Sequence, residues 1–259
     1  MDKGINLMQG KTKYDMVPVS EGSGRSSLRL SNVWKAPVYS KSRLLRPEKN
    51  VMIEKRCIFG DSPALNHFKV FRTQFRQRTR EYGWNSIMVT SPGKGEGKTQ
   101  IAVNLGLSFA RDFHETVMIV DCDLKKQDVS RSFGIDSQYG IIDVVLNQKP
   151  LNEVIFWPYI DKLTIISGGR PISDGAEVLG SPGMTMLCRD LKTRYADRYV
   201  LYDMPPVLDR AEAIVFAPLV DGILLVIEEG GTSMRDIQRA LEILPKEKML
   251  GFVMNRKIL

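Results

Sequence analysis

The sequence is poor in cysteine and histidine, and it lacks any long hydrophobic run. Three cysteines, Cys57, Cys122 and Cys188, and two histidines occur among 259 residues. They form neither a paired disulfide framework nor a cluster with zinc-ligand spacing, so we expect a reducing cytoplasm and no zinc site. The longest apolar runs, such as Ile223 to Ile227, have about five residues, whereas a membrane-spanning helix needs about 20. The first residues also lack the pattern of a secretory signal.

Positive charge is concentrated at the beginning of the chain. The formal net charge is +7, and residues 1–60 hold 12 of the 37 basic and 5 of the 30 acidic side chains, which leaves 25 of each sign for the rest. Residues 1–57 lack sustained periodicity, so we predict a mostly flexible basic tail there and a folded domain at residues 58–259. The basic residues that follow Trp34 suit either contact with an anionic membrane or a solvated linker.

A short apolar run, a glycine-rich turn and a helical pattern follow one another at residues 84–110. Ile87 to Val89 suit a buried strand, and apolar residues recur at helical spacing from Ile101 to Ala110. The turn reads Ser-Pro-Gly-Lys-Gly-Glu-Gly-Lys-Thr, close to the phosphate-binding pattern G-x-x-x-x-G-K-[ST], with Pro92 at the first glycine position. Glycines allow positive φ and bring backbone N–H groups close to an anion, at the start of a helix whose dipole favours negative charge.

The turn predicts the ligands of a nucleotide. Lys98 would bind the β- and γ-phosphates, and Thr99 would bind Mg²⁺ through its hydroxyl. The residues expected to surround the nucleotide are Gly93, Lys94, Gly95, Glu96, Gly97, Lys98, Thr99 and Gln100.

Two further apolar runs end in carboxylates. Val117 to Val120 lead into Asp121-Cys-Asp123, and Tyr199 to Tyr202 lead into Asp203. Ligands of open α/β sheets bind at the carboxyl ends of strands, and an aspartate after an apolar strand is where a Walker B carboxylate holds Mg²⁺. We predict that Asp203 and Asp121 join Thr99 at the metal, that Asp121 orients the attacking hydroxyl or water, and that Asp123 acts beside them. With Lys98, these three aspartates are the predicted catalytic residues. A helix cap is the alternative for Asp121 and Asp123.

Strands and helices alternate through the rest of the chain. Nearly all-apolar strands indicate a sheet that is covered on both faces. The sequence therefore predicts an α/β fold with a doubly wound, mostly parallel sheet, helices on both faces and a flexible basic tail in front. Further strands are expected at residues 163–167, 222–227 and 249–254, and helices at residues 62–82, 141–146, 184–195 and 233–244.

Together, the three motifs resemble those of a known family. Residues 91–99, 117–125 and 199–206 resemble the Walker A, A′ and B motifs of bacterial tyrosine kinases. These BY-kinases include the CpsD/CapB-like capsule and exopolysaccharide proteins of the MinD/ParA-related P-loop ATPases, and the resemblance covers about residues 62–259. It implies an ATP- and Mg²⁺-dependent protein tyrosine autokinase that regulates exopolysaccharide or capsule synthesis and export.

The resemblance also implies residue roles and partners. Asp121 would help to deprotonate the tyrosine, and Asn255 would lie near the adenine, although by itself Asn255 could equally be a strand-end turn residue. The implied partner is a membrane chain-length regulator, a Wzz-like transmembrane activator that recruits the cytoplasmic protein to the inner face of the plasma membrane. Self-association is also implied, and no specific nucleic acid is expected.

Two positions depart from the family pattern. Lys125 stands where arginine is usual, which keeps the charge but loses the bidentate fork. The family's E-x-x-R-x-x-R motif for subunit packing aligns with Asn66, Lys69 and Arg72, so ring assembly is an open question at this stage.

The acceptor tyrosine separates the functions considered. The family's C-terminal tyrosine cluster is missing from this sequence, whose last tyrosine, Tyr202, belongs to an expected core strand. The first hypothesis is an autokinase with Tyr14, Tyr39 or a separate protein as acceptor. The second is a nucleotide-switched regulatory ATPase of the polysaccharide machinery without tyrosine kinase activity. The third is a ParA/MinD-like positioning ATPase, whose early signature lysine aligns with Gly93, one residue before Lys94.

Overall fold

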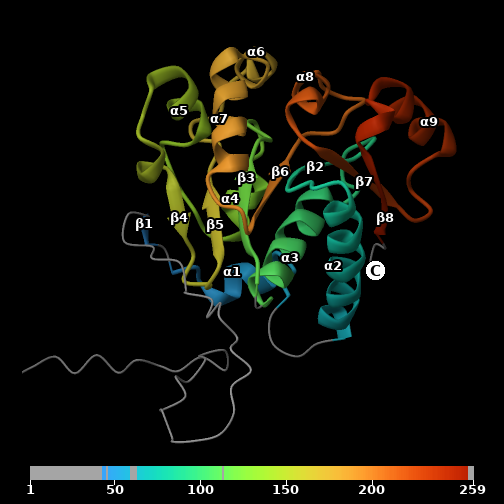
Figure 1. Cartoon of the computed structure of the whole chain (residues 1–259), viewed down its shortest axis with the longest axis horizontal. Helices are drawn as coiled ribbons and strands as arrows, with labels where there is room; N and C mark the ends of the chain where they lie inside the picture. Colours follow the sequence, from blue (N-terminus) through green and yellow to red (C-terminus); the bar gives the residue numbers. More distant parts are fainter. Residues whose placement is uncertain (1–42, 45, 59–62, 113, 256–259) are drawn as a thin grey trace, which may run out of the picture. The chain divides into compact units, whose positions relative to one another are not determined.

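The computed structural model describes residues 43–44, 46–58, 63–112 and 114–255 (Figure 1). The expectations for residues 1–42, including Tyr14, Tyr39 and the membrane contact after Trp34, lie outside the described residues. None of the helices in the described ranges has the length and hydropathy of a membrane span.

One eight-stranded sheet organises the described residues. The strand order is β1-β4-β5-β3-β6-β2-β7-β8, and every neighbouring pair is parallel except β4 with β5. The strands are β1 (Arg43–Leu44), β2 (Ser86–Thr90), β3 (Thr116–Asp121), β4 (Ile155–Trp157), β5 (Leu163–Ile166), β6 (Arg198–Asp203), β7 (Gly222–Glu228) and β8 (Met249–Asn255).

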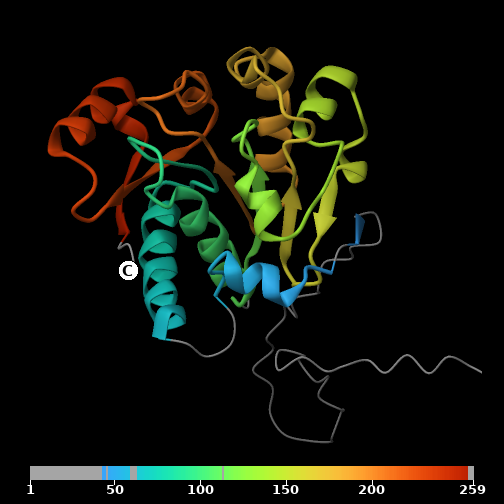
Figure 2. The same ribbon diagram turned by 180° about the vertical axis from the view of Figure 1, so that it is seen from behind.

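Helices cover both faces of the sheet (Figures 1 and 2). Alternation along each strand divides its side chains between two cores: Met88 of β2 packs with residues of α5 to α9, and Ile87 and Val89 pack with residues of α1 to α4. The prediction of a doubly wound, mostly parallel sheet is confirmed. The helices are α1 (Lys49–Glu54), α2 (Pro63–Glu81), α3 (Lys98–Ala110), α4 (Asp128–Ser132), α5 (Ile141–Asn147), α6 (Gly175–Leu179), α7 (Pro182–Thr193), α8 (Glu212–Phe216) and α9 (Met234–Ile243).

The described part of the expected tail is folded, in contrast to the sequence prediction. Residues 46–58 include α1, and Met52 and Cys57 are buried in the same core as α3. The apolar residues of this stretch are three in a row, Val51 to Ile53, followed by Cys57 and Ile58, and this spacing shows no clear helical period. The burial of Met52 and Cys57 in the core that contains α3 shows that the segment is folded. The folded part of the chain therefore includes residues before 58. The predicted domain boundary between residues 57 and 58 stays a prediction.

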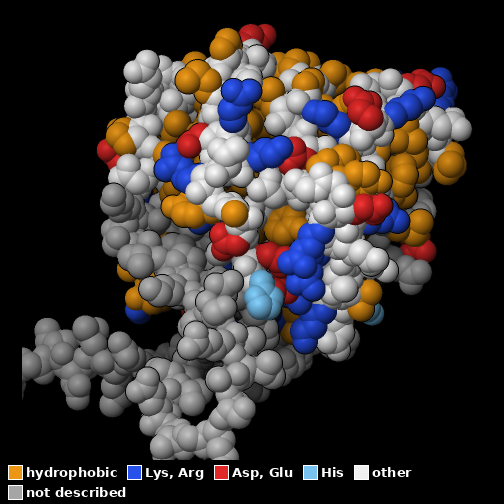
Figure 3. Space-filling model, viewed as in Figure 1, with side chains coloured by type: hydrophobic (Ala, Val, Ile, Leu, Met, Phe, Trp, Pro, Cys, Tyr) orange, Lys and Arg blue, Asp and Glu red, His pale blue; other side chains and the backbone are white. Residues whose placement is uncertain are grey.

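Ion pairs join α2 to the segment that precedes β3. Asp112 lies 3.4 Å from Arg72 and 3.1 Å from Arg76, and Glu115 lies 3.4 Å from Arg76 and 2.7 Å from Arg80. Figure 3 shows Lys and Arg side chains in a column over α2, beside acidic side chains. Both carboxylates are almost buried, and each faces two guanidinium groups, which offsets the cost of desolvation. Arg72, at a position of the family's packing motif, is thus engaged within its own chain.

Candidate active site

The phosphate-binding loop connects β2 to α3. Lys98 is the first residue of α3, and Gly95 and Gly97 adopt positive φ of 85° and 88°. Gly93 was expected to share this conformation, but its φ does not fall in the positive range. A Cβ at Gly97 would lie 2.0 Å from Nδ2 of Asn255. Glycine at this position therefore serves both the left-handed turn and the close approach of β8.

Pro92, the departure from the loop pattern, fits the structure through its carbonyl group. Its oxygen accepts a hydrogen bond from Leu208 N at 3.2 Å, and Ser91 O accepts one from Val207 N at 2.9 Å. These bonds join the phosphate-binding loop to the loop that follows β6. Residue 92 contributes its carbonyl oxygen to this contact, which proline retains. The N–H group that proline lacks is not part of it.

Glu96 shapes the loop from within. Its Oε2 accepts a hydrogen bond from Gly93 N at 2.8 Å, and its Oε1 accepts one from Thr232 Oγ1 at 2.5 Å. Its carbonyl oxygen accepts a bond from Asn255 Nδ2 at 3.0 Å. Asn255 therefore lies beside the phosphate-binding loop, although it comes from the last described strand.

Lys98, Thr99, Asp123 and Asp203 meet at the carboxyl ends of β3 and β6. The Lys98 ammonium lies 3.2 Å from Asp123 Oδ2 and 3.7 Å from Asp203 Oδ1. Thr99 Oγ1 donates to Asp203 Oδ2 at 2.6 Å. The carboxylates of Asp203 and Asp123 raise the pKa of Lys98, although burial acts in the opposite direction. The predicted convergence of these four side chains is thus present.

Asp121 and Asp203 are neighbours on adjacent strands and are fully buried. Asp121 Oδ2 accepts hydrogen bonds from N and Oγ of Ser130, at 3.0 and 3.1 Å. Burial, together with the nearby Asp203 carboxylate, raises the pKa of Asp121 to about 8, and burial raises the pKa of Asp203 to about 6. The Oδ1 atom of each aspartate has no hydrogen-bond partner among the described residues. Two buried carboxylates with unused acceptor atoms are an arrangement that a bound cation would stabilise.

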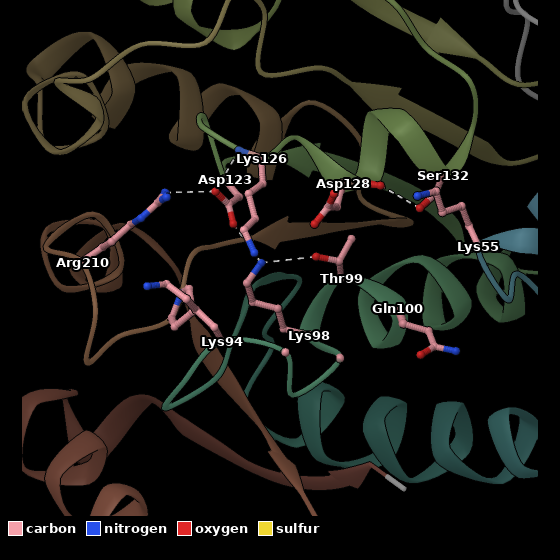
Figure 4. Close-up of a pocket in the computed structure, with 13 residues that line it drawn as sticks. Lys55, Lys94, Lys98, Thr99, Gln100, Asp123, Lys126, Asp128, Ser132 and Arg210 are labelled. Carbon is pink, nitrogen blue, oxygen red and sulfur yellow. Dashed lines mark hydrogen bonds and ion pairs between the residues drawn. The ribbon is translucent and has the colours of Figure 1, made fainter. Parts of the chain in front are cut away.

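A pocket of about 290 Å³ opens at this point. Figure 4 shows Lys98 at its centre, between Asp123 and Thr99, with Arg210 directed at Asp123. Of the predicted residues, Lys94, Gly95, Gly97, Lys98, Thr99, Gln100 and Asp123 line it; Gly93, Glu96, Asp121, Asp203 and Asn255 lie behind or beside the lining. The residues that line it without having been predicted are Lys55, Lys126, Asp128, Ser132, Pro206 and Arg210.

Comparison with known proteins decides the family. The sequence matches no family model. It is 30% identical to tyrosine-protein kinase YwqD of Bacillus subtilis (strain 168) over 221 residues, which cover 84% of this chain and 90% of that protein.

The chain belongs to the bacterial tyrosine-protein kinases.

Two further similarities extend this family assignment. The kinase is 30% identical over 175 residues to the succinoglycan biosynthesis transport protein ExoP of Rhizobium meliloti (strain 1021), across 66% of this chain and 22% of that longer protein. The chimerical protein CapA2B2 shares the fold, with a TM-score of 0.71 at 22% identity over 86% of this chain and 95% of that one. Membership of this family implies that the kinase binds a nucleotide, and the pocket beside the phosphate-binding loop is the candidate site.

The residues near the predicted metal position of the kinase suit Mg²⁺. They offer the hydroxyl of Thr99 and the carboxylates of Asp203 and Asp121, all of them hard oxygen donors. In the described part of the chain, no three His, Cys, Asp or Glu side chains form a ready-made metal cluster. Mg²⁺ commonly takes one or two carboxylates and completes its shell with waters and substrate phosphates. The donor set and the two unused Oδ1 atoms therefore fit this ion.

Two basic residues of the kinase site carried no sequence signal. Arg210 NH1 lies 3.1 Å from Asp123 Oδ1, so Asp123 is held between this guanidinium and the Lys98 ammonium. Arg210 follows the Asp203 motif in an irregular loop, and Lys55 precedes Lys98 of the phosphate-binding loop by 43 positions. Neither residue belongs to a spacing pattern, and only the folded chain brings them to the pocket.

Proposed function

We propose that this chain transfers the γ-phosphoryl group of ATP, bound with Mg²⁺, to tyrosine as an autokinase. The observation that carries the proposal is the meeting of Lys98, Thr99 and Asp203 at a place where the buried Oδ1 atoms of Asp121 and Asp203 accept no hydrogen bond from the described residues. Phosphoryl transfer depends mainly on positioning and charge stabilisation, and these residues supply both.

Each residue has a role that its surroundings support. Lys98 would leave Asp123 and contact the β- and γ-phosphates, with Arg210 holding Asp123 in place. Thr99 and Asp203 would hold the metal, which when bound neutralises charge on the phosphate oxygens. Asp121 would accept the proton of the tyrosine hydroxyl, because it lies at the carboxyl end of β3 beside Asp203 and its Oδ1 accepts no hydrogen bond from the described residues. Burial raises the pKa of Asp121, and a bound cation would lower it toward the ionised form that a base requires.

The base of the nucleotide would lie on the β8 side of the loop. Asn255 is positioned there by its hydrogen bond to the Glu96 carbonyl. Gln100, on the first turn of α3, lines the pocket on the same side of Gly97. We assign Asn255 to the adenine on this basis.

The biological process follows from the relatives. ExoP is by name a transport protein of succinoglycan biosynthesis, which supports a role in regulating exopolysaccharide or capsule synthesis and export. We propose a membrane chain-length regulator as activating partner and the inner face of the plasma membrane as the place of action. Self-association would use contacts other than the Arg72 guanidinium, which is paired with Asp112.

The test is phosphotyrosine mapping by mass spectrometry after incubation with Mg²⁺ and ATP, with and without the cytoplasmic segment of the partner. Wild-type protein should acquire phosphotyrosine, Lys98→Met should acquire none, and Lys246→Met, which removes an exposed lysine far from the pocket, should behave as wild type. Phosphate on Tyr14 or Tyr39 would identify an acceptor in the N-terminal part of the chain.

A regulatory ATPase without tyrosine transfer is the second candidate. The observation that favours it is the complete burial of Tyr202 on β6, because a buried tyrosine cannot serve as acceptor in the folded chain. ATP hydrolysis that depends on Lys98, without phosphotyrosine on this chain or on the partner, would replace the autokinase with this function. The 30% identity to tyrosine-protein kinase YwqD favours a kinase over the ParA/MinD-like alternative.

A further inference from the structure

The pocket includes a lysine from a segment that none of the motifs contains. Lys55 lies at the end of α1, yet it lines the same pocket as Lys98, Thr99 and Gln100. In Figure 4 it enters from the end of the pocket where Asp128 and Ser132 lie, away from Arg210.

The backbone around Lys55 is held by the core and by a tight turn. Met52 is 3% exposed and packs in the core that contains α3. Arg56 adopts a positive φ of 54°, and Cys57 N donates to Met52 O at 2.9 Å, which closes the helix end. Lys55 therefore projects from an anchored turn.

A buried side chain of α3 fastens this turn to the phosphate-binding helix. Asn104 Nδ2 donates to Arg56 O at 3.1 Å, and Asn104 Oδ1 accepts from Ile58 N at 2.8 Å. Asn104 is 2% exposed, and it lies on the helix that Lys98 begins. An amide that satisfies both a donor and an acceptor of the chain next to it fixes the register of the two segments.

The charge of Lys55 is available to a ligand. Lys98 and Arg210 are paired with Asp123, and Lys94 lies 3.7 Å from Asp209. Asp128, at the same end of the pocket as Lys55, pairs with Arg131. Within the described ranges, the Lys55 ammonium forms no ion pair, so a polyanion in this pocket would meet an uncompensated positive charge.

We propose that Lys55 binds the phosphates of the nucleotide and that Asn104 is its positioning residue. The proposal rests on the proposed function, because it requires a nucleotide in the pocket. It makes residues 46–58, which precede all three motifs, part of the nucleotide site, and it makes nucleotide affinity depend on how this segment is attached to α3.

The experiment measures the dissociation constants of MgATP, MgADP and adenosine by calorimetry for wild type, Lys55→Gln, Lys55→Arg and Lys49→Gln. Lys49 begins the same helix, is exposed and does not line the pocket, so its variant matches the charge change. An ammonium about 4 Å from a phosphate in a solvated site implies about fivefold weaker MgATP binding for Lys55→Gln at low salt.

Four results are expected together. Loss of affinity should be largest for MgATP, smaller for MgADP and absent for adenosine; it should shrink as salt rises, because exposed charges are screened. Lys55→Arg should restore MgATP binding, and Lys49→Gln should bind as wild type. Equal MgATP affinities for Lys55→Gln and wild type, or an equal loss for adenosine, would overturn the proposal.

Two further variants separate this proposal from its premises. Lys98→Met tests the nucleotide site itself: if it and the wild type both fail to bind MgATP, the proposed function fails, whereas loss in Lys98→Met with unchanged Lys55→Gln defeats only the inference. Asn104→Ala should weaken MgATP binding in the wild-type background but not in Lys55→Gln, because its effect acts through Lys55. Equal losses in both backgrounds would overturn the positioning role.

Discussion

The two ends of β3 carry buried acidic residues in opposite circumstances. Before the strand, Asp112 and Glu115 each face two arginines of α2. At its carboxyl end, Asp121 and the neighbouring Asp203 are more deeply buried, and the Oδ1 atom of each accepts no hydrogen bond in the described structure. The carboxylates before the strand each face two guanidinium groups, whereas among the described residues Asp121 has no ion pair and Asp203 faces only the Lys98 ammonium, at 3.7 Å.

This difference in ion pairing distinguishes carboxylates that stabilise the fold from carboxylates that are positioned to bind a ligand. Ion pairing within the chain offsets the desolvation cost of a buried carboxylate. Where pairing is incomplete, burial raises the pKa of the carboxylate, and a bound cation would stabilise its ionised form. Burial raises the pKa of both Asp121 and Asp203. Buried carboxylates whose pKa is perturbed beside a pocket are a sign of a functional site.

The largest expected effect concerns Asp203. Asp203→Asn removes a charge from the metal position but keeps the shape, so tyrosine phosphorylation should fall by about 100-fold or more. The melting temperature without nucleotide should be equal to or above that of wild type, because a fully buried carboxylate is replaced by a neutral amide while Lys98 keeps its ion pair with Asp123. Radiolabelled phosphate transfer and calorimetry measure the two quantities. A variant that loses activity only in proportion to a loss of folded protein would contradict the comparison.

At the other end of the strand, the analogous change should act on stability. Glu115→Gln leaves Arg80 with a neutral partner and Arg76 with Asp112 as its remaining carboxylate. We expect it to lower the free energy of unfolding by about 1–3 kcal/mol. MgATP affinity of the folded protein should not change. Urea denaturation measures the first quantity, and Glu247→Gln, at an exposed position, is the matched control. If Glu115→Gln is as stable as this control, the α2 ion pairs do not have the structural role assigned to them.

The third expected effect is a change in pH dependence at Asp121. A folded-state pKa of about 8, raised from 3.8, means that the folded protein holds a proton that the unfolded chain has released. Stability from this group is therefore lost as pH rises from about 4 to about 8. In Asp121→Asn this loss is absent, so the unfolding free energy of the variant relative to wild type should increase by about 1 kcal/mol or more across this window. Denaturant titrations without nucleotide or metal at several pH values measure it; a constant difference would show that burial does not perturb Asp121.

Sequence patterns predicted the elements that repeat a simple period. Apolar runs located β2, β3 and β6, and the spacing of Leu65, Phe68, Phe71 and Phe75 located α2. The short β4 was missed, because three residues next to a turn carry too little periodicity, and its antiparallel pairing with β5 depends on the turn between them.

The sequence by itself determined the phosphate-binding loop and the meeting of Lys98, Thr99 and Asp203. Local spacing encodes a loop, and in a parallel sheet all carboxyl strand ends share one edge. Only the tertiary structure decided that Arg210 holds Asp123, that Asp121 is buried beside Asp203, and that Lys55 reaches the pocket. These contacts join segments that are far apart in the chain through burial and charge pairing. The local hydrophobic periodicity of the sequence contains no information about such contacts.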